Sequence, residues 1–292
     1  MMLAVKPRIR EIQESDLDAI ADLLTRGFVH SRREYWRRGL QRQARRFLPS
    51  GAPRYGYLIE NQGVPVGCLL LIYSTKIVNA ETATFCNLSS WYVDPAFRNY
   101  AALFASMAQK RKDVTYFNVT PATPTWPILE AQGFQLYCRG LHFSVPALSP
   151  GGRGMTIEAV TPDTLVVGGL PGDDFELLKR HAEYGALSLV CHTAESALPF
   201  VFFPLRKRRG VIPVPAMQLG YCRSIEEYVR CAGAIGRYFL RRGKPIIIVD
   251  ANGPVAGLPG IYTEVRGRKY FKGPHRPRLG DLADTELAIY GP

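Results

Sequence analysis

The chain has 292 residues, more than one average domain, so its length favours two compact units. Hydrophobic residues make up 47% and charged residues 21% of the sequence, which excludes an intrinsically disordered chain. The net charge of +12 attracts anionic ligands. We favour a phosphate-rich small molecule over a nucleic acid, because no helix-turn-helix, zinc-finger or RNP motif accompanies the charge.

The positive charge is clustered along the chain. Four segments are strongly basic: residues 32–46, 206–209, 241–242 and 266–269. A solvated basic surface explains these segments as simply as an anion-binding site does, and the sequence leaves both interpretations open.

Apolar runs and cysteine spacing bear on the compartment and on metals. The apolar runs are far shorter than the roughly 20 residues that cross a bilayer. Lys6 and Pro7 interrupt the N-terminus before the apolar region of a secretory signal can form. The six cysteines show no Cys-x-x-Cys spacing, so we expect reduced, buried thiols and no metal site. These features predict a cytoplasmic protein that does not enter a membrane.

Strands and helices alternate in the first half. A period-two pattern predicts a strand at Arg8–Ile12, and Ser15 with Asp18 predicts the capped start of a helix. An arginine-rich helix from Ser31 to Leu48 is expected to be interrupted or bent near Gly39. The next predicted elements are a hairpin of Tyr55–Glu60 and Val66–Ser74, a strand at Thr82–Val93, a helix at Ala101–Lys110, a strand at Val114–Asn118 and a short helix at Trp126–Gln132.

The stretch Val93-Asp94-Pro95-Ala96-Phe97-Arg98 ends the long strand and opens a helix. It resembles the acyl-coenzyme A binding motif of the GNAT (GCN5-related N-acetyltransferase) superfamily. The order of elements from Arg8 to Val145, with Gly133-Phe134 before the last strands, is similar as well. The resemblance implies an α/β fold with a mixed sheet. It also implies an acyl-CoA dependent N-acyltransferase, which moves an acyl group from acetyl-CoA or another acyl-CoA to a small acceptor.

The same resemblance implies a donor site. It places coenzyme A at the residues that match the family's motif: Tyr92, Val93, Arg98, Asn99, Tyr100, Ala101, Ala102, Leu103 and Asn118. Backbone N–H groups at a helix N-terminus suit the pyrophosphate of coenzyme A. The family has a glycine where this chain has Ala101, and a glycine or alanine where it has Leu103.

The family's usual acid–base groups are missing from their usual positions. The long strand carries no carboxylate over Cys86–Tyr92, and Leu129 stands where a tyrosine is expected. Ser89, Ser90 and Tyr137 are the catalytic candidates because they lie close to the motif in the inferred sheet, although each is also an ordinary strand residue. We expect proton transfer through water or hydroxyl groups, without a carboxylate–tyrosine pair.

The second half repeats the first. Gly and Pro are dense at Ser149–Gly154, which places a boundary between domains 1–150 and 151–292. The repeated elements are a helix at Phe175–Tyr184, strands at Leu187–Cys191, Pro199–Arg206 and Pro215–Cys222, a helix from Ile225 to Arg242 capped by Ser224, and a strand at Pro245–Asp250. Glu226 and Glu227 would repel a pyrophosphate at the start of the second helix. We therefore expect a degenerate GNAT-like copy that binds no coenzyme A.

Two functions follow from the sequence. We favour an acyltransferase that acts on an amine or hydroxyl of a small molecule. The alternative is a catalytically silent GNAT-like protein that only binds a ligand. A nucleic-acid binder is the least favoured class, and the sequence predicts no oligomeric state.

Overall fold

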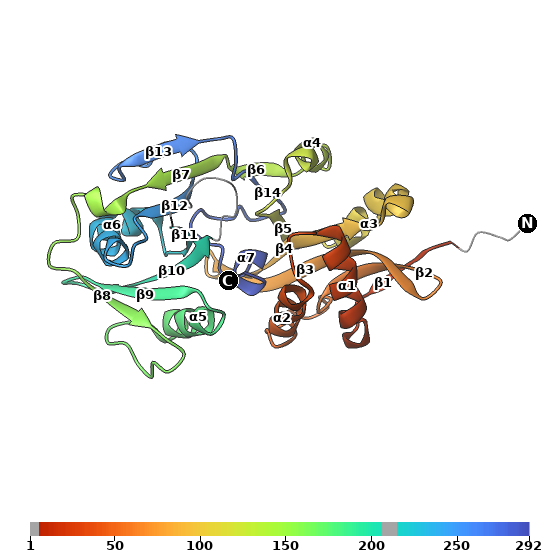
Figure 1. Cartoon of the computed structure of the whole chain (residues 1–292), viewed down its shortest axis with the longest axis horizontal. Helices are drawn as coiled ribbons and strands as arrows, with labels where there is room; N and C mark the ends of the chain where they lie inside the picture. Colours follow the sequence, from red (N-terminus) through yellow and green to blue (C-terminus); the bar gives the residue numbers. More distant parts are fainter. Residues whose placement is uncertain (1–5, 206–214, 292) are drawn as a thin grey trace, which may run out of the picture. The chain divides into compact units, whose positions relative to one another are not determined.

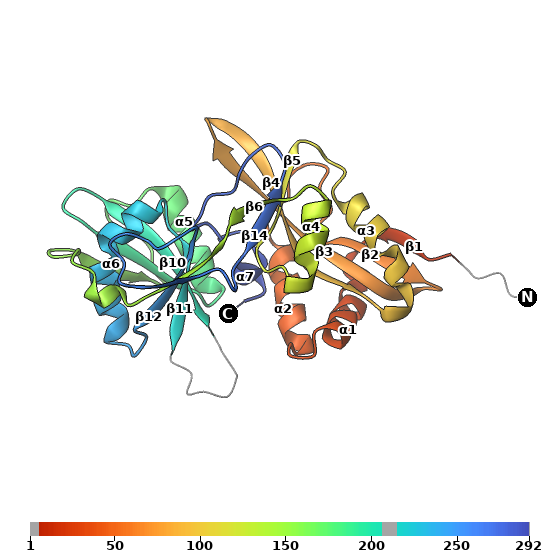
Figure 2. The same ribbon diagram turned by 90° about the horizontal axis from the view of Figure 1, so that it is seen from above.

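The protein is described by a computed structural model that covers residues 6–205 and 215–291. Within these residues the chain forms two compact units (Figure 1, Figure 2). Unit one holds residues up to Gln135, together with Tyr270–Arg276 and Asp284–Tyr290, and unit two holds Leu136–Lys269 and Pro277–Ala283. The predicted basic cluster at 206–209 and the N-terminal residues 1–5 lie outside the described residues.

A mixed sheet is the framework of the first half. Its strand order is β1-β2-β3-β4-β5-β14-β6. The elements are β1 (Arg8–Glu11), η1 (Glu14–Asp16), α1 (Leu17–Gly27), α2 (Arg33–Ala44), β2 (Gly56–Asn61), β3 (Val64–Val78), β4 (Glu81–Val93), η2 (Pro95–Tyr100), α3 (Ala101–Ala108), β5 (Val114–Asn118), η3 (Thr123–Thr125), α4 (Trp126–Ala131) and β6 (Gln135–Cys138). Two late elements, β14 (Lys269–Lys272) and α7 (Glu286–Ile289), follow near the end of the chain. The predicted α/β fold is confirmed.

The pairing of β4 changes along its length. It is antiparallel to β3 throughout, but parallel to β5 only over Thr84–Asn87. Its register with β3 shifts between Leu69 and Leu71, so Ser89 and Ser90 form a bulge. Beyond Asn87, β4 continues to Val93 with no further pairing to β5. The backbone of residues 88–93 on the β5 side is called the open edge below.

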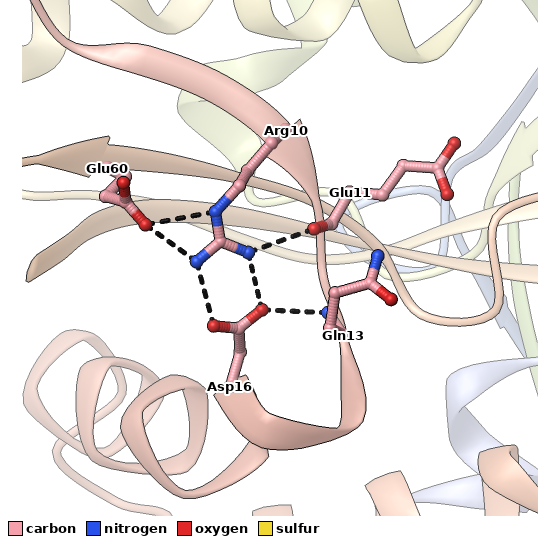
Figure 3. Close-up of polar contacts among 5 residues, drawn as sticks. All are labelled: Arg10, Glu11, Gln13, Asp16 and Glu60. Atoms are coloured by element: carbon pink, nitrogen blue, oxygen red, sulfur yellow. Dashed lines mark hydrogen bonds and ion pairs between the residues drawn. The ribbon is translucent and has the colours of Figure 1, made fainter. Parts of the chain in front are cut away.

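Arg10 fixes the edge strand β1 (Figure 3). Its guanidinium donates to Glu60 of β2 at 2.7 Å and to Asp16 of η1 at 2.6 Å. Asp16 also accepts a hydrogen bond from the backbone N–H of Gln13 at 2.8 Å. The predicted Ser15–Asp18 cap is therefore wrong: the helical segment begins at Glu14, and its capping box is formed by Gln13 and Asp16.

The predicted interruption of the arginine-rich helix near Gly39 is also wrong. α2 runs without interruption from Arg33 to Ala44. Gly39 is buried in the middle of this helix, and a Cβ there would overlap the ring of Tyr290. The glycine makes room for an aromatic ring that follows α7.

The second sheet has the strand order β13-β7-β12-β11-β10-β9-β8. Its elements are β7 (Gly140–Ser144), η4 (Pro146–Leu148), β8 (Thr156–Val160), α5 (Gly172–Glu183), β9 (Leu187–His192), β10 (Ala197–Leu205), β11 (Ala216–Tyr221), α6 (Ile225–Leu240), β12 (Ile246–Ala251) and β13 (Gly260–Thr263). β11 is parallel to β12 over Ala216–Gln218 and its register with β10 shifts soon afterwards, as β4 does in unit one. The predicted Ser224 cap is confirmed, because Ser224 Oγ accepts from the N–H of Glu227 at 3.1 Å.

The Gly- and Pro-rich segment at 149–154 packs against α6. A Cβ on Gly233 would overlap the backbone of Gly151, and Arg237 donates to the carbonyl of Gly152 at 2.8 Å. The compact units divide at Gln135, so this segment lies inside unit two. The boundary between domains 1–150 and 151–292 stays a prediction about how the chain is divided into copies.

All six cysteines are buried and free of disulfides, as predicted. Among the helices of residues 6–205 and 215–291, none has the length and apolar character needed to cross a membrane. In the same part of the chain, no three His, Cys, Asp or Glu side chains are grouped to hold a metal ion.

Candidate functional site

The open edge of β4 carries polar groups that the protein leaves available. Ser89 is 8% exposed, and its Oγ has no hydrogen-bond partner among the described residues. The indole N–H of Trp91 is also buried and has no hydrogen-bond partner among the described residues. Ser90 is half-buried beside them. Buried polar atoms without partners are rare in folded proteins and point to a bound ligand or water.

Asn87 marks the point where β4 and β5 part. It is fully buried, and its amide donates to the carbonyl of Phe117 on β5 at 3.3 Å. Its Oδ1 accepts from the backbone N–H of Glu286 at 2.9 Å. One side chain therefore joins β4, β5 and the start of α7.

A carboxylate lies at this point. Glu286 Oε1 accepts from the hydroxyl of Thr120 at 2.6 Å. The backbone N–H of Thr120 in turn donates to Asn118 Oδ1 at 3.1 Å. Burial, and secondly the charge of Glu286, raise the pKa of Tyr35 to about 12. Sequence analysis did not identify this carboxylate, because Glu286 is 199 residues from Asn87.

Aromatic rings pack beside the carboxylate. Trp36 is buried, with its ring centroid 4.9 Å from that of Tyr35, 5.9 Å from Tyr290 and 5.3 Å from Phe28. Its indole N–H has no hydrogen-bond partner among the described residues. These contacts place an unsatisfied donor and a half-buried phenol in the same cluster.

The side chain of Tyr92 faces α1. A Cβ on Gly27 would overlap its ring, and burial with a hydrogen bond to Asp94 raises the pKa of Tyr92. Arg26 pairs with Asp94 at 3.3 Å. Tyr92 and the buried Val93 form the end of the open edge, so their backbone lies where the resemblance places the donor.

The predicted pyrophosphate loop has a different form from an open, glycine-rich loop. Residues Pro95–Tyr100 make the 3-10 helix η2, which leads directly into α3. The N–H of Phe97 donates to the carbonyl of Asp94, and that of Ala101 to Arg98. Since a 3-10 helix uses its own N–H groups, few of these amides remain for an anion. Arg98, Asn99, Ala102 and Leu103 are exposed, and Tyr100 and Ala101 are half-buried; their contacts with a donor stay a prediction.

The catalytic candidates from the sequence are divided between the units. Ser89 and Ser90 lie on β4 of unit one, whereas Tyr137 lies in unit two. Tyr137 is buried, and its carbonyl accepts from the side-chain amide of Asn252 at 3.0 Å. Their roles in catalysis stay a prediction.

The corresponding edge in unit two is filled by the chain. The N–H of Leu282 donates to the carbonyl of Gly220 at 2.7 Å, and the N–H of Cys222 donates to Gly280 at 2.9 Å. Tyr221 pairs with Asp281 between them. The edge of β11 beyond its parallel pairing is therefore occupied by residues 280–282.

Asp250 lies on β12 just past Gln218–Ile248, the last pair of the parallel strands in unit two. Lys269 Nζ lies 2.9 Å from Asp250 Oδ1, and both side chains are 2% exposed. Gln218 donates to the same oxygen at 3.4 Å. The charge at this position is enclosed and paired within the unit.

No protein-family model matches the sequence, and no curated protein matches it either. Solved structures do match. A GCN5-related N-acetyltransferase from Anabaena variabilis aligns with a TM-score of 0.58 and 11% identity over 91% of this chain and 72% of its own. A GCN5-related N-acetyltransferase from Kribbella flavida aligns with a TM-score of 0.55 and 13% identity, over 94% of this chain and 72% of its own. Eis1 from Mycobacterium abscessus aligns with a TM-score of 0.50 and 13% identity, over 95% of this chain and 74% of its own.

These similarities extend over both halves of the chain, and their low identity establishes architecture alone. Each sheet has a parallel strand pair that separates next to a register shift. The chain therefore has the fold of the GCN5-related N-acetyltransferases, with two sheets that fit two tandem copies.

Proposed function

We propose that unit one binds acyl-coenzyme A along the open edge of β4 and transfers the acyl group to an amine of a small acceptor. The observation that carries this proposal is the contrast between the two edges. The edge of β4 is unpaired beyond Asn87, while residues 280–282 fill the edge of β11. An unpaired strand edge presents N–H and C=O groups to a partner. The two amides of a pantetheine arm are suited to pair with such groups.

The bulge supplies groups for the reacting carbonyl. A bulge leaves one residue outside the hydrogen-bond ladder. Backbone N–H groups at Ser89 and Ser90 are therefore suited to stabilise the oxyanion that forms when a nucleophile attacks a thioester. Ser89 Oγ, buried without a partner, adds a further polar group there.

The phosphates of the donor need a different partner from the family's amide loop. The N–H groups of Phe97 and Ala101 are used inside the helical segment. Arg98 is exposed on η2, and its guanidinium supplies the positive charge that a pyrophosphate requires.

A small acceptor fits the charge distribution better than a nucleic acid. Several arginines of segment 32–46 are paired inside unit one, and Arg33 of α2 pairs with Asp18 and Asp22. Arg46 of the same segment pairs with Asp284 at 2.7 Å. Compensated arginines contribute little to a phosphate-binding surface.

Calorimetric titration tests the donor site. Coenzyme A and pantetheine are titrated into the wild type, Arg98→Glu and Arg230→Glu. Arg230 is exposed on α6, so its variant makes the same change in net charge in unit two. We expect Arg98→Glu to weaken coenzyme A about tenfold and to leave pantetheine unchanged, since only the former carries phosphates. Arg230→Glu should alter neither.

Equal weakening by both variants would show non-specific charge attraction and contradict the proposal. If the wild type bound neither coenzyme A nor pantetheine, that result would also contradict the proposed donor site. Thiol release from acetyl-coenzyme A with a panel of primary amines then tests the transfer. If the protein bound coenzyme A but released no thiol with any amine, it would be the catalytically silent binding protein.

A further inference from the structure

The carboxylate of Glu286 lies where acyl transfer needs a proton acceptor. Its backbone N–H is bound to Asn87, the last β4 residue paired with β5. The open edge begins at the next residue. An acyl group carried along that edge toward the bulge therefore reaches the neighbourhood of Glu286.

Two side chains hold the carboxylate in place. Thr120 donates its hydroxyl to Oε1 at 2.6 Å, and the turn that carries Thr120 is closed by Asn118 at 3.1 Å. Asn87 fixes the backbone. A general base needs this kind of fixed position, within hydrogen-bond reach of the proton that it removes.

Two phenols lie near the carboxylate, Tyr35 of α2 and Tyr290 after α7, and the charge of Glu286 acts on both. Burial raises the pKa of Tyr290 well above its ordinary value, and that of Tyr35 rises to about 12. Both phenols therefore stay neutral near pH 7, so neither can act as the proton acceptor.

A purely structural role would use Glu286 only as an anchor for α7. Glutamine keeps the backbone N–H that donates to Asn87 and an oxygen that can accept from Thr120, and it removes the charge. A pH profile of the variant therefore separates the two roles.

We infer that Glu286 is the general base of the acyl transfer; this inference rests on the proposed function. Glu286 takes a proton from the acceptor ammonium and leaves a neutral amine. The amine nitrogen forms a bond to the thioester carbonyl carbon, and the carbon–sulfur bond breaks. The departing sulfur takes the second proton from the nitrogen, so the products are an amide and the free thiol. Glu286 then returns its proton to solvent.

The test compares Glu286→Gln, Thr120→Val and Glu130→Gln in thiol release between pH 5.5 and 9.5. Glu130 is a matched control, because it is another carboxylate of unit one that accepts one hydroxyl, from Tyr270 at 2.9 Å. We expect Glu286→Gln to lower kcat at least about a hundredfold, with the affinity for coenzyme A unchanged. The acidic limb of its pH profile should disappear. Glu130→Gln should behave as the wild type.

Thr120→Val tests the positioning of the carboxylate. A carboxylate that loses a hydrogen-bond donor holds its proton more tightly, so the acidic limb should move to higher pH while coenzyme A binding is retained. An anchor without a base role would lower kcat without moving this limb. This variant also decides the question if Glu286→Gln fails to fold.

The outcomes separate the two proposals. The wild type and Glu286→Gln could both turn over, with kcat values within threefold of each other and the same acidic limb. This result would overturn the role of Glu286 and leave acyl transfer intact. Lack of thiol release by the wild type with every amine would overturn the transfer itself, and the base with it.

Discussion

At the scale of residues, the two units differ in how accessible the charged side chains are near the point where their parallel strands separate. Unit one has the neutral Asn87 there, beside the half-buried Glu286. In unit two the last β11 residue paired with β12 is Gln218, whose amide donates to Asp250 at 3.4 Å. Asp250 and Lys269 are each 2% exposed and paired at 2.9 Å. A charge that is fully enclosed with its partner contributes to structure and is unavailable to a substrate.

The enclosed pair predicts a stability effect. Lys269→Met should lower the free energy of unfolding by about 3–5 kcal/mol, because Asp250 is left buried without its cation. Lys269→Met combined with Asp250→Leu should recover most of that loss. Chemical denaturation of the single and double variants measures both values. A double variant as unstable as the single one would contradict this account of the pair.

The Arg10 network predicts a dependence on acid. Hydrogen bonding to Arg10 is the main cause that lowers the pKa of Asp16 below its ordinary 3.8. A carboxyl group whose pKa is lower in the folded state stabilises the fold above its unfolded pKa. That contribution is lost as the pH falls through the folded pKa.

Asp16→Asn should therefore cost about 1 kcal/mol at pH 7, and this difference from the wild type should shrink as the pH falls below about 4. Urea denaturation at pH 7 and at pH 3 measures it. The same loss at both pH values would show that the charge of Asp16 is not the cause.

At the scale of elements, α2 and α7 are joined through one ring. Tyr290 lies against Gly39 of α2, and its hydroxyl donates to Gln43 Oε1 at 2.8 Å. Arg42 donates to the carbonyl of Ile289 at 3.1 Å. These contacts hold α7 on α2 and so fix the segment that carries Glu286.

Gly39→Ala should destabilise the protein although alanine favours a helix by up to about 1 kcal/mol. The added methyl group displaces the Tyr290 ring, at a cost of about 1–3 kcal/mol. Gly172→Ala at the start of α5 is the control, since a Cβ there meets nothing within 4 Å. Thermal unfolding of both variants measures the difference. A more stable Gly39→Ala variant would show that the ring can move without cost.

At the scale of the whole molecule, the described residues use one architecture twice, and the strand edge beyond the parallel pair is open in unit one and occupied in unit two. The difference does not lie in strand order, because both sheets have a parallel pair beside a shifted antiparallel register. It lies in residues 280–282, which pair with β11 in unit two.

We therefore expect one equivalent of coenzyme A per chain. Hydrogen exchange should slow in peptides that cover residues 88–93 when coenzyme A is added. Peptides that cover 220–222 should be unaffected, since the Cys222 N–H is already bound to Gly280. Calorimetry gives the stoichiometry and mass spectrometry gives the exchange. Two equivalents, or new protection at 220–222, would contradict the assignment to unit one.

The sequence by itself determined the α/β class, most strands and helices up to β12, and local features such as the Ser224 cap, but not β8, β13, β14 or α7. These depend on periodicity and on residues within one turn of each other, which a sequence displays directly. The Val93–Arg98 stretch likewise indicated the fold through adjacent residues.

The tertiary structure alone decided the site. Glu286 meets Asn87 across 199 residues, and Leu282 closes the edge beside Gly220. The same holds for Gly39, whose place in an unbroken helix depends on a ring that follows α7. Such contacts follow from the path of the folded chain, because distant residues are brought together only when the core forms. No pattern of neighbouring residues carries that information.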